Sequence, residues 1–568
     1  MPRSAVAAAI LLLGLVPHHS LSSQAAPARD PLVGLWGGGE MALAASVQGA
    51  VTVERTANSW TMRVGGFEAH APASGDSLVL RLPGGQGSLR AQIHGDSLEG
   101  YWIQPAAFGS PSYASPVRFH SRAAGAWDGT VTPLIQRFPL YLAIRRLDDG
   151  ELRGTFRNPE ANWPGRAGAM RILREGSEVL FFDVRTGKSR YRQPFDSAAG
   201  TLLFDFGAPL VLTRRSDDDA VGFFPRAPAL PPYTYRQPGR GVDGWRTASA
   251  ASARVREASL ELIVRQIASA DPLTDSLPRV HALLVARHGT LVLDEYFHGY
   301  SEDRPHDLRS ASKTMTSIML GAAMYRGAPL SIGSPIDAAQ PHTGITIGHL
   351  LTHSSGLACD DDDDNSPGNE DRMQSQPETD WYRYTLSLAR IHAPGRVYAY
   401  CSGGVNLVGR AIGMATHTWL PAEFDRHVAR PLQITNYTMN LMPSGEMYAA
   451  GGMHMRPRDF LKFGQLYLNG GIWSGRRIVS RQWVTLTTAR QIDRPDGSSD
   501  GYGWHRHTLR VAGRQYETFE ASGNGGQFVI VVPQLDLVVA ATAGNYGQYA
   551  VWQRIRTELV PQVIAAAR

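Results

Sequence analysis

The stretch that decides the fold is Arg309-Ser-Ala-Ser-Lys-Thr-Met-Thr-Ser-Ile-Met-Leu320. Its apolar residues from Met315 onward recur at helical spacing and follow the polar segment Asp307-Leu-Arg309, which predicts a helix that begins near Ser310. Lys313 follows Ser310 by three residues, and side chains at that spacing are neighbours on one face of a helix. The pattern therefore predicts a serine and a lysine in contact at a helix start.

This pair has the chemistry of a hydrolytic nucleophile. A serine hydroxyl is a poor nucleophile until a neighbouring base takes its proton. A lysine can act as that base only if its amine is neutral near pH 7, and we expect burial and the positive end of the helix dipole to lower the pKa of Lys313. Arginine cannot replace it because the guanidinium keeps its proton. Only three of the 56 basic residues are lysines, so a chance match to Ser-x-x-Lys is rare; the alternative is a solvated lysine near a helix-capping serine.

Two further segments carry candidate site residues. In Pro394-Gly-Arg-Val-Tyr-Ala-Tyr-Cys-Ser-Gly-Gly404, helical periodicity resumes after the second glycine, so Tyr400 and Ser402 are expected on the turn before a helix. A phenol there could share a proton with the lysine, although a tyrosine at such a turn is more often a packing residue. In Ala521-Ser-Gly-Asn-Gly-Gly-Gln527, glycines at a strand end allow close approach of a substrate to the backbone. An N–H group in this segment, from Gly523, Asn524 or Gly525, together with the N–H of Ser310, would form an oxyanion hole; a plain Gly-rich turn is the alternative.

Together these segments resemble the serine β-lactamase and penicillin-binding-protein superfamily, in its class C-like branch. That branch includes class C β-lactamases, D-alanyl-D-alanine peptidases, esterases and nylon-oligomer hydrolases. Ser310-x-x-Lys313 and Tyr400-Cys-Ser402 match its first two motifs. Three further landmarks occur in the expected order: Ile347-Gly-His-Leu-Leu-Thr-His-Ser-Ser-Gly-Leu357, Ala450-Gly-Gly-Met453 and Asn469-Gly-Gly471.

The resemblance implies an α+β fold for residues 248–568: a β-lactamase/transpeptidase-like domain with an antiparallel sheet, flanking helices and a helical subdomain. It also implies an acyl-enzyme mechanism in which Ser310 is the nucleophile, Lys313 and Tyr400 move the proton, and no cofactor or metal takes part. The family's basic residue is absent from Ala521-Ser-Gly523, and Ser402 stands where β-lactamases have asparagine. We therefore expect an esterase or amidase with neutral substrates. The alternatives are a D-alanyl-D-alanine carboxypeptidase, a β-lactamase, or a non-catalytic binding protein that keeps the fold as a scaffold.

The chain before this domain is organised differently. Residues 1–26 have a basic start, a short apolar run and small residues at the end, which is typical of a signal peptide; we expect an exported protein, periplasmic or extracellular. Residues 31–225 alternate apolar and polar side chains between Gly/Asp turns, which predicts an all-β accessory region. Gly34-Leu-Trp-Gly37 is echoed by Gly125-Ala-Trp-Asp-Gly129, and Gly95–Trp102 by Asp148–Phe156, so two related modules are one interpretation and chance similarity another. Residues 226–247, rich in Pro, Gly and Arg, are expected to form a linker.

Composition excludes several other classes. The net charge is +5, but the basic residues are scattered among acidic ones, so we expect no nucleic-acid partner. No apolar run is long enough to span a membrane, no His-Glu-x-x-His zinc motif occurs, and the oligomeric state is left open. Under export, a disulfide between Cys359 and Cys401 is favoured over two free thiols. The run Asp360 to Asp364 is interpreted as a solvated acidic loop at the rim of the site in preference to a calcium site, because it lacks the spacing of a calcium loop.

Overall fold

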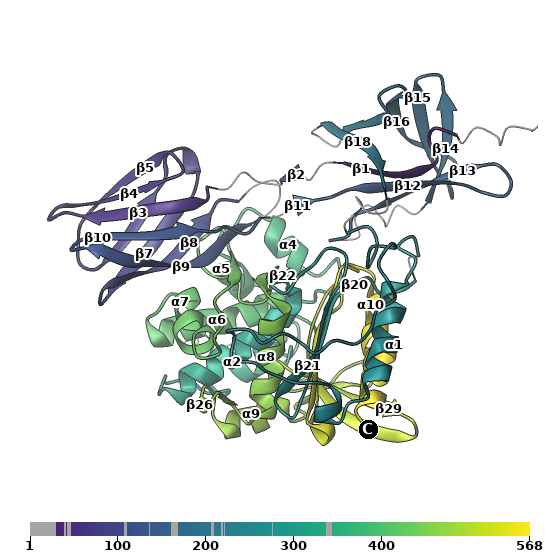
Figure 1. Ribbon diagram of the computed structural model, residues 1–568. Helices are drawn as coiled ribbons and strands as arrows, with labels where there is room; N and C mark the ends of the chain where they lie inside the picture. Colours follow the sequence, from purple (N-terminus) through teal and green to yellow (C-terminus); the bar gives the residue numbers. More distant parts are fainter. Residues whose placement is uncertain are drawn as a thin grey trace, which may run out of the picture.

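The computed structural model describes residues 30–568 except 39–40, 43–46, 107–110, 136, 161–168, 206–208, 217–219, 221, 275 and 337–343. The predicted signal peptide, residues 1–26, lies outside the described residues. The described chain forms a mixed helix-and-sheet domain with two β assemblies above it (Figure 1). None of the helices in the described part combines the length and apolar character needed to cross a membrane.

The helix-and-sheet domain is built on one nine-stranded sheet whose strands come from both ends of the domain. Strands β20 (Val280–Arg287) and β21 (Thr290–Tyr296) form a hairpin, and β20 pairs antiparallel with β32 (Leu537–Ala543) near the C-terminus. The sheet order is β19-β21-β20-β32-β31-β30-β29-β28-β27. The other strands are β19 (Arg246–Thr247), β27 (Ile492–Asp493), β28 (Ser499–Asp500), β29 (His505–Val511), β30 (Arg514–Gly523) and β31 (Gln527–Val532). The α+β prediction is confirmed.

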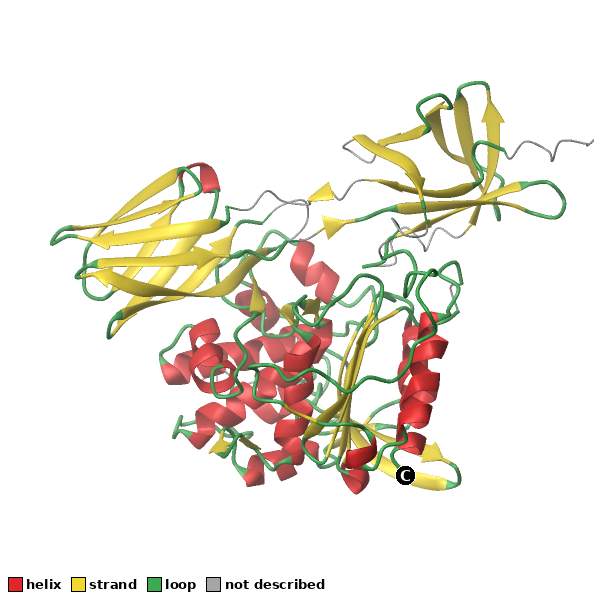
Figure 2. Ribbon diagram, viewed as in Figure 1, coloured by secondary structure: helices red, strands yellow, loops and turns green. Residues whose placement is uncertain are grey.

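Helices cover both faces of this sheet (Figure 2). One face packs against α1 (Glu257–Ala268), α10 (Tyr549–Arg554) and α11 (Val560–Ala566). The other face packs against α2 (Ser312–Tyr325) and α8 (Pro457–Leu468), and beyond them lie α3 (Ile347–Leu351), α4 (Glu370–Ser375), α5 (Trp381–Ser387), α6 (Ser402–Thr416), α7 (Leu420–Phe424) and α9 (Arg481–Thr488). Because successive strand residues point to opposite faces, Leu284 joins the α2 side of the core and Val285 the α1 side. The sheet and α2 together hold the Ser-x-x-Lys segment.

The all-β region contains a closed eight-stranded antiparallel barrel. It consists of β1 (Gly34–Gly38), β12 (Tyr141–Arg146), β13 (Leu152–Arg157), β14 (Ala169–Glu175), β15 (Glu178–Asp183), β16 (Ser189–Asp196), β17 (Thr201–Asp205) and β18 (Pro209–Arg215). Inward-facing apolar and aromatic side chains, such as Trp36 and Phe204, are fully buried in it. A filled interior of this kind is usual for a barrel of eight strands.

A second antiparallel β assembly lies between β1 and β12 in the chain. Its strands are β3 (Gly49–Arg55), β4 (Ser59–Val64), β5 (Phe67–Pro72), β6 (Ser77–Arg81), β7 (Ser88–His94), β8 (Ser97–Gln104), β9 (Ser112–Ala123) and β10 (Ala126–Val131). They pair in chain order except between β5 and β6, and β10 closes the other side by pairing with both β3 and β9. The assembly therefore matches the barrel in strand number and order but is open between β5 and β6.

The two strands that carry the Gly-x-Trp echo lie in different assemblies. Strand β1 carries Trp36 and pairs with β12 and β18, whereas β10 carries Trp127 and pairs with β3 and β9. Each of these strands therefore closes its own assembly by pairing with two neighbours. The second echo does not coincide, because Gly95–Trp102 covers β8 and Asp148–Phe156 covers β13. That the two are related modules stays a prediction.

The second assembly is joined to the helix-and-sheet domain by backbone pairing. Strand β9 pairs with β23 (Tyr437–Leu441), which continues to β24 (Met453–Met455) and β22 (His306–Asp307). The side chains of Tyr101 and Tyr437 also meet at this junction. The proposed linker, residues 226–247, packs on the same domain, since Tyr233 donates to Glu295 at 2.7 Å and the Trp245 indole donates to the carbonyl of Arg458 at 3.0 Å. These contacts attach the segment to the domain, and its role as a linker and domain boundary stays a prediction.

Candidate active site

The structure brings Ser310 and Lys313 together. Ser310 lies in a 3₁₀ turn, Arg309–Ala311, that leads directly into α2. The Nζ atom of Lys313 donates to Ser310 Oγ at 2.9 Å and to the carbonyl of Ala450 at 2.9 Å. Lys313 is 5% exposed, whereas Ser310 is only partly buried. Ser310 is thus the more exposed residue of the pair, and Lys313 contacts it from the buried side.

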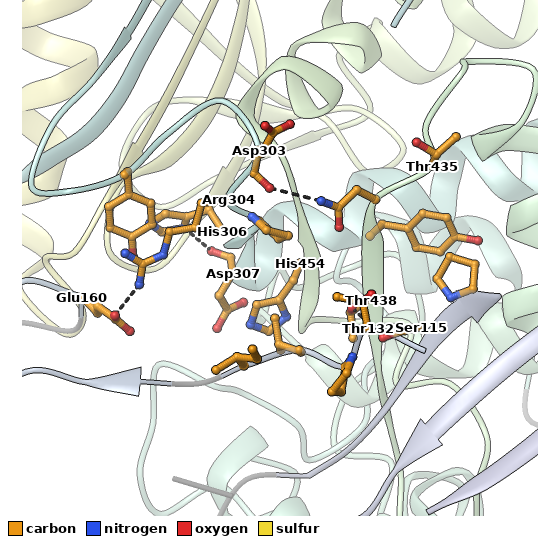
Figure 3. Close-up of a pocket in the computed structure, with 18 of the residues that line it drawn as sticks. Ser115, Thr132, Glu160, Asp303, Arg304, His306, Asp307, Thr435, Thr438 and His454 are labelled. Atoms are coloured by element: carbon orange, nitrogen blue, oxygen red, sulfur yellow. Dashed lines mark hydrogen bonds and ion pairs between the residues drawn. The ribbon is translucent and has the colours of Figure 1, made fainter. Parts of the chain in front are cut away.

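The backbone before Ser310 is strained. Arg309 has φ +48°, a left-handed conformation that non-glycine residues rarely adopt. Two contacts with Asp307 hold it: the backbone N–H of Arg309 donates to Oδ1 at 2.9 Å, and its side chain pairs with Oδ2 at 2.8 Å. Asp307 lies in a groove beside the site (Figure 3). The ion pair fixes the turn that presents Ser310.

The expected neutral state of Lys313 is wrong. Burial does lower the pKa of the amine, but the charges of Tyr400, Glu370 and Asp361 and a hydrogen bond with Tyr400 outweigh burial, so the pKa is raised above its usual value. Sequence reasoning weighed burial and the helix dipole. The sequence alone did not indicate that the fold places Tyr400, Glu370 and Asp361 near the amine. Lys313 is therefore an ammonium in the resting protein, and the hydrogen bond to Ser310 runs from nitrogen to oxygen.

Tyr400 lies beside this ammonium. It immediately precedes Cys401, the N-cap of α6, and Lys313 Nζ is 4.9 Å from its ring centroid. Ser402 is the first residue of α6, and not on the turn before it, and is fully buried. The structure thus brings Ser310, Lys313 and Tyr400 together, whereas Ser402 is enclosed at the start of α6.

His353 holds the Tyr400 segment and was missed by sequence reasoning. Its Nδ1 accepts from the backbone N–H of Cys401 at 3.2 Å, and its carbonyl accepts from that of Ala399 at 2.8 Å. Its ring lies against Tyr400, with centroids 4.4 Å apart. Burial lowers the pKa of His353 to about 3, so the imidazole is neutral at neutral pH. In the sequence, His353 lies in the segment 347–357, which was identified only as a family landmark. That match was the one signal that could have pointed to His353.

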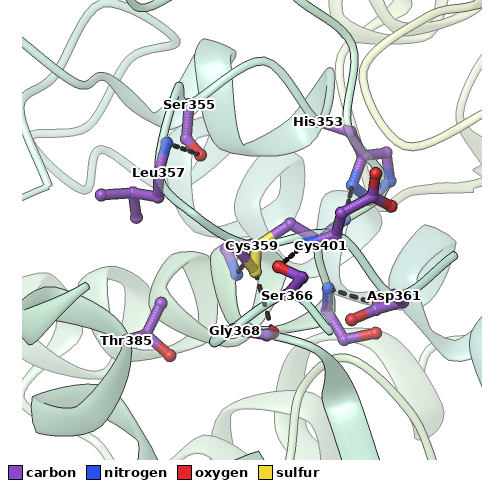
Figure 4. The surroundings of a disulfide bond; sticks show 12 residues. His353, Ser355, Leu357, Cys359, Asp361, Ser366, Gly368, Thr385 and Cys401 are labelled. Carbon is purple, nitrogen blue, oxygen red and sulfur yellow. Dashed lines mark hydrogen bonds between the residues drawn. A yellow bond between two sulfur atoms is a disulfide. The ribbon is translucent and has the colours of Figure 1, made fainter. Parts of the chain in front are cut away.

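A disulfide and a half-buried carboxyl, that of Asp361, lie next to the Tyr400 segment; Figure 4 shows the disulfide with Asp361. Cys359 and Cys401 are bonded, with Cα atoms 5.3 Å apart. Two residues after Cys359, the N–H of Asp361 donates to the carbonyl of Tyr400 at 2.7 Å, and Asp361 Oδ2 accepts from the N–H of Ser402 at 2.8 Å. Burial and the charge of Glu370 raise the pKa of Asp361 to about 7.

The acidic run is therefore not a uniform solvated loop. Asp362 to Asp364 are exposed, as expected, but Asp361 turns inward toward Lys313 and Glu370. Glu370 accepts from the hydroxyl of Tyr448 at 2.6 Å. Across the described residues, no group of three or more His, Cys, Asp or Glu side chains is arranged to hold a metal ion.

Of the three candidate oxyanion residues, Gly523 is the one brought to Ser310. A Cβ on Gly523 would lie 2.2 Å from the carbonyl of Leu308 and 3.1 Å from the N of Ala311, so only glycine fits there. The pairing of β29 with β30 ends at Glu520, which leaves that side of residues 521–523 outside the ladder. Asn524 and Gly525 contact the following loop instead: Asn524 Oδ1 accepts from the N–H of Gly547, and a Cβ on Gly525 would meet Tyr546.

The comparisons with known proteins agree with this geometry. Residues 279–551 match the family model described as Beta-lactamase. Over 327 residues the chain is 25% identical to the 6-aminohexanoate-dimer hydrolase of Paenarthrobacter ureafaciens, which covers 51% of this chain and 80% of that protein. This match confirms the predicted resemblance of the helix-and-sheet domain, hereafter the superfamily domain, to the serine β-lactamase and penicillin-binding-protein superfamily.

Solved structures similar to the domain include EstCE1, a hydrolase with promiscuous acyltransferase activity (18% identity, 55% of this chain and 98% of that chain, TM-score 0.43). Another is a penicillin-binding protein from Bacillus halodurans (16% identity, 52% of this chain and 99% of that chain, TM-score 0.42). The match to the Beta-lactamase family model, together with the similarity to the 6-aminohexanoate-dimer hydrolase, supports hydrolase activity for this domain.

Proposed function

We propose that this protein is an exported serine hydrolase that cleaves esters or amides through an acyl-enzyme on Ser310. The observation that carries the proposal is the 2.9 Å contact between Lys313 Nζ and Ser310 Oγ in a site that also contains Tyr400. A positioned nucleophile with a lysine and a phenol beside it has the parts needed for acyl transfer. The N-terminal sequence supports export.

The proton route follows from the charge on Lys313. Since an ammonium cannot accept the Ser310 proton, we assign that proton to the oxygen of Tyr400, whose ring centroid lies 4.9 Å from Lys313 Nζ. Ser310 Oγ then bonds to the substrate carbonyl carbon, and the negative charge on the carbonyl oxygen is held by N–H groups of Ser310 and Gly523. The carbon–oxygen or carbon–nitrogen bond to the leaving group breaks as that group takes the proton back.

Water completes the cycle by the same route in reverse. It loses a proton to Tyr400 and attacks the acyl carbon, the bond to Ser310 Oγ breaks, and Oγ regains the proton as the acid leaves. No cofactor enters this cycle. The absence of a basic side chain in Ala521-Ser522-Gly523 supports neutral esters or amides over substrates that bind through a carboxylate. The matched 6-aminohexanoate-dimer hydrolase is consistent with an amide substrate.

The test is covalent labelling of the intact protein. A fluorophosphonate probe is expected to add once, on Ser310, and the protein is expected to hydrolyse p-nitrophenyl acetate. Ser310→Ala should abolish both, whereas Ser301→Ala, at an exposed serine, should change neither. Absence of labelling and of turnover in the wild type would support a non-catalytic scaffold and would overturn the proposal.

A further inference from the structure

A large groove lies at the junction of the second β assembly and the superfamily domain. Its volume is about 930 Å³, and both parts of the chain line it (Figure 3). Ser115 and Thr132 come from the N-terminal strands and the segment after β10, whereas Thr438, His454 and Asp307 come from the superfamily domain. A cavity of this size can hold a small ligand or several units of a chain molecule.

The floor of the groove is a polar row on a continuous sheet. Thr438 on β23 faces His454 on β24, and His454 faces Asp307 on β22. Ser115 on β9 extends the row, since its hydroxyl hydrogen-bonds that of Thr438 at 3.0 Å. The alternate residues Ala114, Met439 and Met453 belong to the apolar core. The sheet thus has one apolar face and one hydrogen-bonding face, as strand geometry requires.

This polar row is not an ordinary solvated surface. Ser115, Thr438 and His454 are 5%, 4% and 7% exposed, although all three line the groove. Burying polar groups costs free energy unless they are hydrogen-bonded. Here Ser115 and Thr438 bond each other and His454 Nδ1 bonds to the carbonyl of Gly452 at 3.3 Å, so the row is stable without a ligand, and each hydroxyl oxygen can still accept a further hydrogen bond.

The charged groups of the groove are already paired. Arg304 pairs with Glu160 and covers the ring of Tyr300, with the guanidinium carbon 4.1 Å from the ring centroid. Asp307 pairs with Arg309. A charged ligand would have to break these pairs, whereas a purely aliphatic one would form no hydrogen bond with the hydroxyls of the row. A neutral ligand with amide or hydroxyl groups fits both conditions.

The groove ends next to the candidate nucleophile. Asp307, the last member of the polar row, fixes the backbone of Arg309, and Ser310 is the next residue. Arg309 and Tyr546 both line the groove, and the guanidinium lies 4.8 Å from the Tyr546 ring centroid. A Cβ on Gly525, in the glycine-rich segment after β30, would meet that same ring.

We propose that this groove binds a neutral, amide- or hydroxyl-bearing arm of the substrate, so that the N-terminal strands form part of the specificity site. The proposal rests on the serine hydrolase function proposed above. It assigns the second β assembly a role in recognising an extended substrate, such as a peptide-like or sugar-like chain, whose reacting carbonyl lies at Ser310.

The test compares p-nitrophenyl esters that differ only in their acyl arms. The acetate has no arm, the octanoate has an apolar one, the ester of N-acetylglycylglycine has an amide one, and the 8-hydroxyoctanoate has a hydroxyl one. We expect the wild-type kcat/KM to be higher for the amide or the hydroxyl arm than for the octanoate. A preference for the amide arm would indicate a peptide-like substrate, and a preference for the hydroxyl arm would indicate a sugar-like one.

Two variants of groove residues test whether the preference for a polar arm arises in the groove. Thr132→Trp, at an exposed position on the groove wall, should lower the kcat/KM ratio of the preferred polar-arm ester to the acetate by about tenfold, as expected when a bulky group displaces a bound arm. Thr438→Val should lower the same ratio by removing one hydroxyl from the floor. His120→Trp, exposed on β9 outside the groove, is the matched control.

The outcomes separate the two proposals. If no ester is hydrolysed, including the acetate, the proposed function fails. If the acetate is hydrolysed but octanoate is the preferred arm, or Thr132→Trp leaves every ratio as in His120→Trp, the hydrolase stands and the groove assignment is overturned.

Discussion

The carboxylate of Asp361 accepts a hydrogen bond from the backbone N–H of Ser402 at 2.8 Å, and the N–H of Asp361 donates to the carbonyl of Tyr400 at 2.7 Å. A half-buried acid is thereby hydrogen-bonded to the residues on both sides of Cys401. The charged groups that face it are Glu370 on α4 and Lys313 on α2, and Tyr448 shares a hydrogen bond with Glu370. Asp361 is thus placed to influence the charge of Lys313 without touching Ser310.

Asp361→Asn should change the pH profile of the reaction. The pKa of Asp361 is raised to about 7 by burial and by Glu370, so its ionisation in that range adds negative charge beside Lys313. Asparagine keeps an acceptor for the Ser402 N–H but cannot ionise. We expect the kcat/KM profile for p-nitrophenyl acetate to lose its inflection near pH 7 and its alkaline limb to move to lower pH, because Lys313 then holds its proton less tightly.

The same variant should change the pH dependence of stability. An ordinary aspartate has a pKa of about 3.9, so between about pH 4 and pH 7 the folded state holds a proton that the unfolded chain releases. The wild type should therefore lose stability as pH rises through this window, whereas Asp361→Asn should not. Asp364→Asn, exposed in the same acidic run, is the control. If the stability of Asp361→Asn changes with pH in the same way as that of the wild type and differs only by a constant amount, Asp361 has only a packing role.

Lys313→Arg should be nearly inactive although it keeps the positive charge. Nζ is buried between Ser310 Oγ and the carbonyl of Ala450, a space that fits an ammonium and not a planar guanidinium. A displaced guanidinium would lose the hydrogen bond to Ser310 Oγ and shift the positive charge away from Tyr400. We expect kcat for p-nitrophenyl acetate to fall at least about 100-fold, the scale of one lost electrostatic contact in an active site. Circular dichroism and thermal melting should show a folded variant, and near-normal turnover in it would mean that only the charge is needed.

The site was predictable from sequence where it depends on local spacing, and not where it depends on long-range contacts. Ser310 and Lys313 are three residues apart at a helix start, so their contact follows from helix geometry. His353 and Asp361 act on residues 39 to 48 positions later in the chain, through backbone hydrogen bonds that no periodicity reveals. The charge on Lys313 was wrongly predicted for the same reason.

The fold shows the same division. The α+β class of the domain and the strands of the N-terminal region were predicted from the sequence. The pairing of β1 with β12 and β18 was not, because Gly34-Leu-Trp-Gly37 and Gly125-Ala-Trp-Asp-Gly129 look alike and nothing in either segment indicates which assembly it will join.

The disulfide should stabilise the protein and keep Tyr400 in place. It closes a loop of 42 residues, for which the loss of chain entropy in the unfolded state predicts about 4 kcal/mol of stability. We expect the double variant Cys359→Ser/Cys401→Ser to melt at lower temperature and to lose kcat more than binding of small esters, because Cys401 adjoins Tyr400. Thiol titration under denaturing conditions checks that the wild type has no free thiol. Equal melting temperatures would show that the hydrogen bonds of His353 and Asp361 suffice.

Glu99→Gln should weaken the attachment of the second β assembly in a pH-dependent way. Glu99 on β8 pairs with Arg430, after α7, at 2.6 Å and also with Arg118. Burial alone would raise its pKa, but the two guanidinium groups outweigh burial and lower it to about 2. A depressed carboxyl pKa stabilises the folded state above its unfolded value of about 4.3, and this contribution disappears as pH falls toward about 2.

The melting temperature of Glu99→Gln should therefore lie below that of the wild type at pH 7 and approach it at low pH. Glu68→Gln, in an exposed pair with Arg63 on the same assembly, is the matched control and should change little, since exposed ion pairs contribute little. The groove also depends on this junction, because β8 pairs with β9 and β9 with β23. A Glu99→Gln protein with wild-type melting at pH 7 would mean that strand pairing alone holds the two parts together.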